Sequence, residues 1–173
     1  MQPRVTAIIV VRNGAAWLDR TVAALAAQLR KPDAVVVVDV ASSDGSAELL
    51  PPGAVRSPAQ PFGAAVATGA RHVPAAPAAD EWFWLLTADT APDPGALERL
   101  LAAVEVAPSV AIAGPKVVDP DDAGRILSFG ESISRLGATV RLVDGELDQA
   151  QHDAVTDVLA VTTAGMLVRR SVW

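Results

Sequence analysis

The chain has 173 residues, of which 51% are hydrophobic, and it carries a net charge of −6. This length suits one domain with a substantial core, and the acidic balance argues against a general nucleic-acid-binding protein, which would present a basic face. The sequence contains no cysteine, which excludes disulfides and thiolate metal sites and agrees with a reducing compartment.

We expect neither a secretory signal nor a membrane-spanning helix in this sequence. No apolar run approaches the roughly 18 residues that cross a bilayer, and the first apolar stretch, residues 5–11, follows only Met-Gln-Pro-Arg. The chain closes on the strand-like residues VLAVTTAGMLVRRSVW without a polar tail. We therefore expect it to be cut from a larger protein.

Residues 1–115 alternate between strand-like and helix-like patterns. Apolar, β-branched runs predict buried strands at 5–11, 34–40, 81–86 and 109–114, with a weaker strand at 54–56. Helical spacing and helix-start signals predict helices at about 18–29, 47–50, 61–72 and from 94 onward. Asp93 and Pro94 are the expected N-cap and first residue of the last helix.

Two of these helices carry an apolar face. The expected buried residues are Leu18, Val22, Leu25 and Leu29 in the first helix, and Leu97, Leu100, Leu101 and Val104 in the last. Trp82 and Trp84 alternate along a strand, so we expect both indoles to pack against a helix on one face. We expect Trp17, in the first helix, to be a core residue too.

Strands that alternate with helices predict an α/β fold with a mostly parallel sheet and helices on both faces. After Pro115 the pattern changes to shorter strand-like stretches: RILSFG, ATVRLV, VLAVTT and GMLVRR. We therefore predict two parts, an α/β half at residues 1–115 and the start of a strand-rich section at residues 116–173.

Polar residues follow three of the predicted strands. They are Arg12 and Asn13, then Asp39 with Ser42 and Ser43, and finally Thr87 with Asp89. Ligands of open parallel sheets bind outside the carboxyl ends of the strands, so these residues predict one shared crevice. The simpler alternatives are that Asp89 is a loop acid near a helix start and that Asp39 caps the turn after it; their common location favours ligand roles.

Several other sites are excluded or assigned to local structure. No G-x-G-x-x-G follows the first strand and no Walker-type loop exists, so bound phosphates would need a metal or arginine. A phospho-receiver domain needs acids after the first strand, where this chain has Val11, Arg12 and Asn13. Asp44 and residues 119–124 are expected to form solvated turns, and His72 and His152 to be exposed histidines rather than ligands.

Five segments together resemble the family 2 glycosyltransferases of the GT-A fold: VTAIIVVRNGAAWLDRTVAAL, VVVVDVASSDGS, PFGAAVATGARHV, WLLTADTAPDPGALERLL and AGMLVRRSVW. They occur in the order seen in that family and span nearly the whole chain. The fourth segment and LDQAQHD also resemble large envelope-building glycosyltransferases of actinobacteria, several of which carry transmembrane helices beyond this domain.

The resemblance implies that residues 1–115 bind a nucleotide sugar of UDP or dTDP type. In relatives, the segment matching Val10, Val11 and Arg12 lies along the nucleoside, and the acid matching Asp39 hydrogen-bonds the base, for which a carboxylate suits the imide N–H of uracil or thymine. Val40 replaces the second polar residue of that pattern, and we include Ser42, on the same turn, in the predicted donor site.

The resemblance also implies a diphosphate site at residues 87–89. Asp89 matches the acid that ligates Mg²⁺ or Mn²⁺, hard cations that prefer carboxylate oxygens. Thr87 and Ala88 stand where a second carboxylate is usual, so metal affinity is expected to be weaker. Arg71 loosely matches an arginine that some relatives use against phosphate.

In the mechanism that the resemblance implies, an acceptor hydroxyl of a carbohydrate or lipid attacks the anomeric carbon and inverts it. The acid that deprotonates this hydroxyl lies beyond the segment AGMLVRRSVW in relatives, so we expect residues 1–173 alone to be inactive. The expected location is the cytoplasm, at the inner face of the plasma membrane, with membrane contact only through other parts of the protein. The alternative left open is a degenerate nucleotide-sugar-binding or interaction module without catalysis.

Overall fold

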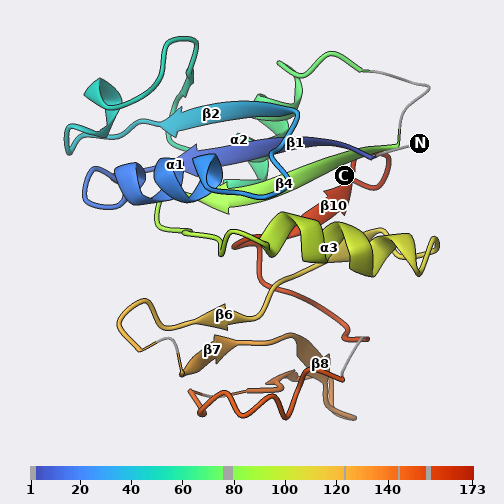
Figure 1. Ribbon diagram of the computed structural model, residues 1–173. Helices are drawn as coiled ribbons and strands as arrows, with labels where there is room; N and C mark the ends of the chain where they lie inside the picture. Colours follow the sequence, from blue (N-terminus) through green and yellow to red (C-terminus); the bar gives the residue numbers. More distant parts are fainter. Residues whose placement is uncertain (1–2, 76–79, 123, 144, 155–156) are drawn as a thin grey trace.

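The computed structural model describes residues 3–75, 80–122, 124–143, 145–154 and 157–173 (Figure 1). Within these residues, six strands form one central sheet in the order β3-β2-β1-β4-β10-β5. Their bounds are β1 (Arg4–Val11), β2 (Ala34–Val40), β3 (Val55–Ser57), β4 (Glu81–Thr87), β5 (Ile112–Ala113) and β10 (Leu167–Arg169). The first four pair in parallel, as predicted, because helical crossovers connect them.

The far side of the sheet differs from the prediction. β10 pairs antiparallel with both β4 and β5, so the end of the chain returns to the central sheet. Residues 116–173 are therefore not a separate section throughout. The expected buried strand at 109–114 is reduced to β5, where Ile112 is 46% exposed. Among the described residues, β5 pairs with β10 alone and so forms an edge of the sheet.

Helices cover both faces of the sheet, which confirms the predicted layers. The helices are α1 (Leu18–Ala26), α2 (Phe62–Ala70) and α3 (Ala96–Glu105), with a short 3₁₀ helix, η1 (Ser46–Glu48), after β2. Leucines of α1 and α3 pack with Trp82 and Trp84 on one face, and Ala65 and Val66 of α2 pack on the other. Among the described residues, no helix has both the length and the apolar character to span a bilayer.

The buried face of α1 is not the expected one. Leu18 and Leu25 are buried, but Val22 is 46% and Leu29 is 74% exposed. Their expected places are taken by Thr21 and by Gln28, just after the helix, which are 1% and 3% exposed. Both side chains face the connection between β4 and α3, whose backbone carbonyls accept their hydrogen bonds.

The apolar face of α3 agrees with the prediction, because Leu97, Leu100 and Val104 are all buried. The helix begins at Ala96 rather than at Pro94, and the carboxylate of Asp93 accepts a hydrogen bond from the Gly95 N–H at 3.0 Å.

The tryptophans divide into two groups. Trp82 and Trp84 are 1% and 0% exposed on the predicted shared face. The prediction for Trp17 is wrong, since its side chain is 51% exposed. Trp17 occupies the turn before α1, and its N–H donates to the Gly14 carbonyl at 3.0 Å. This turn follows the end of β1 and precedes α1, outside the faces where the helices pack on the sheet.

The strand-rich section lies below α3 in Figure 1 and contains two small antiparallel sheets. One pairs β6 (Val117–Val118) with β7 (Ile126–Ser128), and the other pairs β8 (Glu131–Ile133) with β9 (Thr139–Arg141). The stretch VLAVTT, expected to be a strand, makes only an isolated bridge, between Ala160 and Glu131. His152 is not the exposed histidine expected: it is half-buried, stacks on Phe129 with ring centroids 5.1 Å apart, and contacts Glu146.

Candidate functional site

The strand register brings the predicted polar residues to one edge of the sheet. Val11 at the end of β1 is in register with Asp39 of β2, and Val10 is in register with Thr87 of β4. Because β1 lies between β2 and β4, Asp39 near the end of β2 and the loop that carries Asp89 lie on either side of the end of β1. This edge is the geometry that the sequence predicts for a ligand crevice.

Asp39 has an unusual environment for a carboxylate. Its side chain is 4% exposed, and its Oδ1 atom is buried without a hydrogen-bond partner among the described residues. Strand alternation places it on the face covered by α1 and α3, beside Arg56, its register partner on β3. The Arg56 guanidinium instead donates to the Ala47 carbonyl at 3.3 Å. Sequence reasoning missed Arg56, because only the register of β3 reveals this proximity.

The loops after β1 and β2 are fastened to each other. The Asn13 N–H donates to Ser42 Oγ at 3.0 Å, and the Ser43 N–H donates to Asn13 Oδ1 at 2.9 Å. Asn13 and Ala41 adopt positive φ angles of 52° and 50°, which let the two loops turn toward each other. Ser42 thus has a structural role as an acceptor, and its hydroxyl proton is the group it can offer to a ligand.

Asp44 and Ser46 complete this connection. Ala15 donates its N–H to Asp44 Oδ2 at 3.0 Å, and Gly14 donates to Ser46 Oγ at 2.8 Å. The hydrogen bond from the Ser46 hydroxyl, followed by that from Ala15, lowers the pKa of Asp44 below its usual value. Asp44 is therefore more than the local turn residue expected, because it also joins segments 29 positions apart.

Asp89 is held by the two threonines around it. Thr87 Oγ1 donates to Asp89 Oδ1 and also lies 2.7 Å from Thr90 Oγ1, while the Thr90 N–H donates to the Thr87 carbonyl at 3.1 Å. Asp89 itself is exposed, and Ala88 between them is buried. Thr87 thus orients the single carboxylate of this segment instead of adding a second one.

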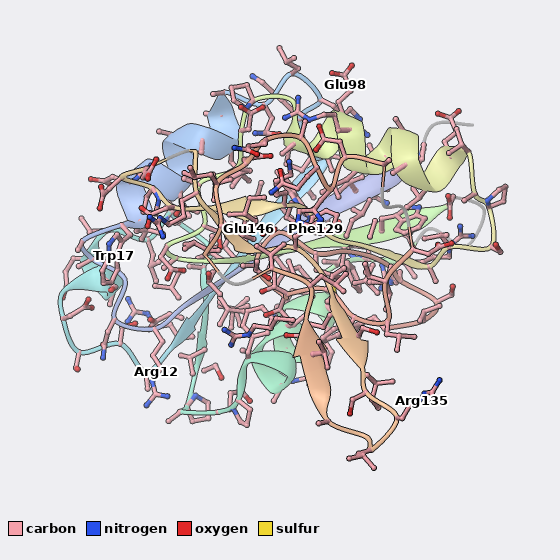
Figure 2. All side chains as sticks on the ribbon, turned by 90° about the horizontal axis from the view of Figure 1, so that it is seen from below. Arg12, Trp17, Glu98, Phe129, Arg135 and Glu146 are labelled. Carbon is pink, nitrogen blue, oxygen red and sulfur yellow. The ribbon has the colours of Figure 1, made fainter. Side chains whose placement is uncertain are left out.

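Besides Asp39, four of the predicted donor-binding residues have buried side chains, all of them apolar: Val10, Val11, Val40 and Ala88. Their side chains belong to the core, so these four residues could contact a donor only with their backbone atoms. Arg12 is exposed at the end of β1, and Figure 2 shows it on the same side of the molecule as Trp17.

The structure does not place Arg71 next to the other predicted donor-binding residues. It follows the last turn of α2, and its guanidinium donates to Thr68 Oγ1 at 3.0 Å, on the face of the sheet opposite Asp39. A hydrogen-bonded chain continues from Thr68 through Gln60 to Ser57, which is in register with Val40. Arg71 thus reaches the carboxyl end of β3 only through other side chains.

The site offers limited protein ligation for a metal. Among the residues that the structure describes, no three His, Cys, Asp or Glu side chains form a group that could hold an ion. The next acid after Asp89, Asp93, is paired with Arg99 at 2.5 Å, and this hydrogen bond lowers the pKa of Asp93. Asp89 is the acid of residues 87–89 whose oxygens could contact a hard cation such as Mg²⁺ or Mn²⁺.

The family model for glycosyl transferase family 2 matches residues 6–141. No curated protein matches the chain. Among solved structures, S. aureus TarS 1-349 aligns with a TM-score of 0.51 and 13% identity over 96% of this chain and 47% of that one. The complex of TarS 1-349 with UDP-GlcNAc aligns with a TM-score of 0.50 and 16% identity, covering 66% and 34%.

This chain therefore spans a third to a half of the length of those structures, and at this identity their likeness concerns the fold. That fold, a mainly parallel sheet with helices on both faces, is the GT-A arrangement. Because the family model covers most of the chain as well, the chain belongs to glycosyl transferase family 2.

Proposed function

We propose that residues 1–173 form the nucleotide-sugar-binding part of an inverting glycosyltransferase. Its donor would be a nucleoside-diphosphate sugar of UDP or dTDP type, and its acceptor a hydroxyl of a carbohydrate or lipid-linked glycan of the cell envelope. Family membership supports sugar transfer, and the TarS structure that shares this fold is described as a complex with UDP-GlcNAc.

The observation that carries the proposal is the Oδ1 atom of Asp39, which is buried and finds no hydrogen-bond partner in the part of the chain that the structure describes. A buried carboxylate oxygen without a donor costs free energy, and buried polar groups in proteins are nearly always hydrogen-bonded. The imide N–H of uracil or thymine is a suitable donor at this position. A base bound here would leave its phosphates at the same edge of the sheet, toward the loop that carries Asp89.

The diphosphate end of the proposed site depends on Asp89 and a divalent cation. The Asp89 carboxylate would hold Mg²⁺ or Mn²⁺, a cation that would supply positive charge against the diphosphate of the donor. Thr87 would keep the carboxylate oriented, and the exposed Arg12 would add positive charge at the same edge.

The transfer step would need more than residues 1–173. The TarS structures extend well beyond the part that this chain covers, which supports our proposal that the acid that deprotonates the acceptor lies elsewhere in the full-length protein. The proposed location is the cytoplasmic face of the plasma membrane, and a cysteine-free sequence agrees with a reducing compartment.

Calorimetric titration of the chain with UDP, dTDP and UMP, with and without Mn²⁺, tests both ends of the site. We expect Asp39→Ala to weaken all three ligands by about tenfold or more, as for a lost hydrogen bond to a charged group. Asp89→Ala should remove the gain that Mn²⁺ gives to UDP and dTDP but leave UMP binding unchanged. Asp19→Ala, an exposed acid of α1, is the matched control.

If all variants bound all ligands with equal affinity, Asp39 and Asp89 would be rejected as ligand-binding residues. The description of the fold would be unaffected. A second candidate function is a nucleotide-sugar-binding module without catalysis. It is favoured by the presence of a single carboxylate in residues 87–89. Nucleotide binding without sugar transfer by the full-length protein would support that module and reject the enzyme.

A further inference from the structure

The side of α1 that faces the Asp89 loop, together with the residues just after the helix, places two buried polar side chains in a mostly apolar core. Thr21 lies in α1 and Gln28 follows its C-terminal end, and both side chains are almost fully buried. Each directs its polar atoms at the connection between β4 and α3, the segment of residues 88–95 that contains Asp89.

Thr21 holds the start of this segment. Its Oγ1 donates to the Ala88 carbonyl at 2.6 Å and also lies 3.4 Å from the Trp17 carbonyl within its own helical turn. Ala88 immediately precedes Asp89, and it is buried against Gly14. The backbone that leads into Asp89 is therefore fixed by a hydroxyl from α1.

Gln28 holds the end of the segment. Its Nε2 donates to the Asp93 carbonyl at 2.7 Å and lies 3.4 Å from the Pro92 carbonyl, while its Oε1 accepts the Leu97 N–H at 3.2 Å. One amide side chain thus bonds both the end of the loop and the first turn of α3. The neighbouring Leu29 N–H adds a bond to the Pro94 carbonyl at 2.8 Å.

We propose that Thr21 and Gln28 are positioning residues for Asp89. By holding the connection at both ends, they keep the Asp89 carboxylate in place before the ligand arrives, so that ordering the loop does not reduce affinity. This proposal rests on the proposed role of Asp89 toward the metal and diphosphate. It adds to that role one residue of α1 and one just after it, neither of which needs to touch the ligand.

The test measures how strongly Mn²⁺ increases UDP affinity in Thr21→Val and Gln28→Leu, which remove the hydrogen bonds at similar size. We expect the gain from Mn²⁺ to fall by about tenfold, as for outer-shell residues of metal sites, while UMP affinity without Mn²⁺ stays unchanged. Thr21→Ser retains the hydroxyl and should restore the gain. Val22→Thr, on the exposed side of α1, is the matched control.

A purely structural role predicts a different result. If Thr21→Val and Gln28→Leu lower the melting temperature but keep the full gain from Mn²⁺, while Asp89→Ala loses it, the positioning role is rejected and the proposed function stands. If Asp89→Ala also keeps the wild-type gain, the proposed function of Asp89 fails, and the positioning role fails with it.

Hydrogen exchange of the wild-type chain gives a second measurement that requires no variant to fold. A loop already held in place should show the same amide exchange over residues 89–95 before and after UDP and Mn²⁺ are added. Strong new protection of these amides on binding would mean that the ligand orders the loop, and it would overturn the proposal.

Discussion

Gly14, in the loop after β1, packs directly against Ala88, in the loop after β4. A Cβ atom on Gly14 would lie 2.3 Å from the Cβ of Ala88, closer than side chains can approach, and Ala88 is itself 6% exposed. The turn that leads into α1 therefore sits against the residue that precedes Asp89, and any side chain at position 14 must move one of the two loops.

The first prediction concerns this contact. Gly14→Ala should destabilise the chain by about 1–3 kcal/mol, as overpacking of a well-filled core does, and should lower the urea midpoint. The double variant Gly14→Ala with Ala88→Gly removes the opposing methyl group and should recover much of the loss. The difference between the single and double variants measures the clash itself.

Gly63 is the matched control for this substitution. It lies in α2, where a Cβ would meet nothing within 4 Å, so Gly63→Ala should stabilise the chain by up to about 1 kcal/mol through helix propensity. Equal effects of alanine at positions 14 and 63 would contradict the close packing of Gly14 and Ala88.

The second prediction compares two tryptophans. Trp84 is fully buried and donates its indole N–H to the Gly165 carbonyl at 3.1 Å, which links β4 to the segment before β10. Trp84→Ala should cost about 3–5 kcal/mol. Trp17→Ala should cost less than about 1 kcal/mol, because half of that side chain is already in solvent. Urea unfolding followed by circular dichroism checks both, and similar losses would place Trp17 in the core after all.

The third prediction separates stability from binding at Asp39. Replacing this buried carboxylate by the neutral amide in Asp39→Asn should raise the free energy of unfolding by about 1 kcal/mol, because the charge has no partner for Oδ1 among the described residues. The same variant should weaken UDP binding, because a carboxylate that binds a ligand can lower the stability of the free protein. Thermal unfolding and calorimetry measure the two effects.

Asp19→Asn on the exposed side of α1 should change neither quantity. If Asp39→Asn instead lowers stability and leaves UDP affinity intact, Asp39 is a structural acceptor for its own turn.

The fourth prediction concerns the pH dependence of the strand-rich section. Lys116 donates to Asp148 and to Asp153, each at 2.8 Å. The bond to Asp148, followed by that to Asp153, raises the pKa of Lys116 above 10.5, and the bond from Lys116 lowers the pKa of Asp148 below 3.8. The stabilisation from Asp148 is then complete above pH 3.8 and lost as pH falls through its lower folded value.

The stabilisation from Lys116 is complete below pH 10.5 and lost as pH rises through its higher folded value. Lys116→Met should therefore lower the urea midpoint at neutral pH. It should also make the urea midpoint depend less on pH at both the acidic and the basic end of the profile. Lys31→Met, at an exposed lysine, is the control and should retain the wild-type profile. A profile of Lys116→Met parallel to wild type would show that this ion pair contributes nothing.

Much of the central sheet follows from local patterns. The β-branched runs of β1 and β2 and the apolar spacing of α3 identify these elements, because strand alternation and helical spacing depend on residues only a few positions apart. The turns that end β2 and β4 are local as well, so the sequence also indicates that Asp39 and Asp89 lie at the ends of strands that finish at the same edge.

Position within the tertiary structure decided the rest. The spacing of α1 allows either Val22 and Leu29 or Thr21 and Gln28 to face inward, and the carbonyls of the β4–α3 connection select the polar pair. In the same way, only the register of β3 puts Arg56 beside Asp39.

The amino-acid sequence by itself determined which segments become strands and helices and which acids follow them, because backbone hydrogen bonding and side-chain alternation act over short stretches of chain. Only the tertiary structure decided that β10 enters the central sheet between β4 and β5, that Gly14 packs on Ala88, and that α1 holds the loop of Asp89. These contacts join residues tens of positions apart, and they form where separate surfaces fit and where buried polar groups find partners.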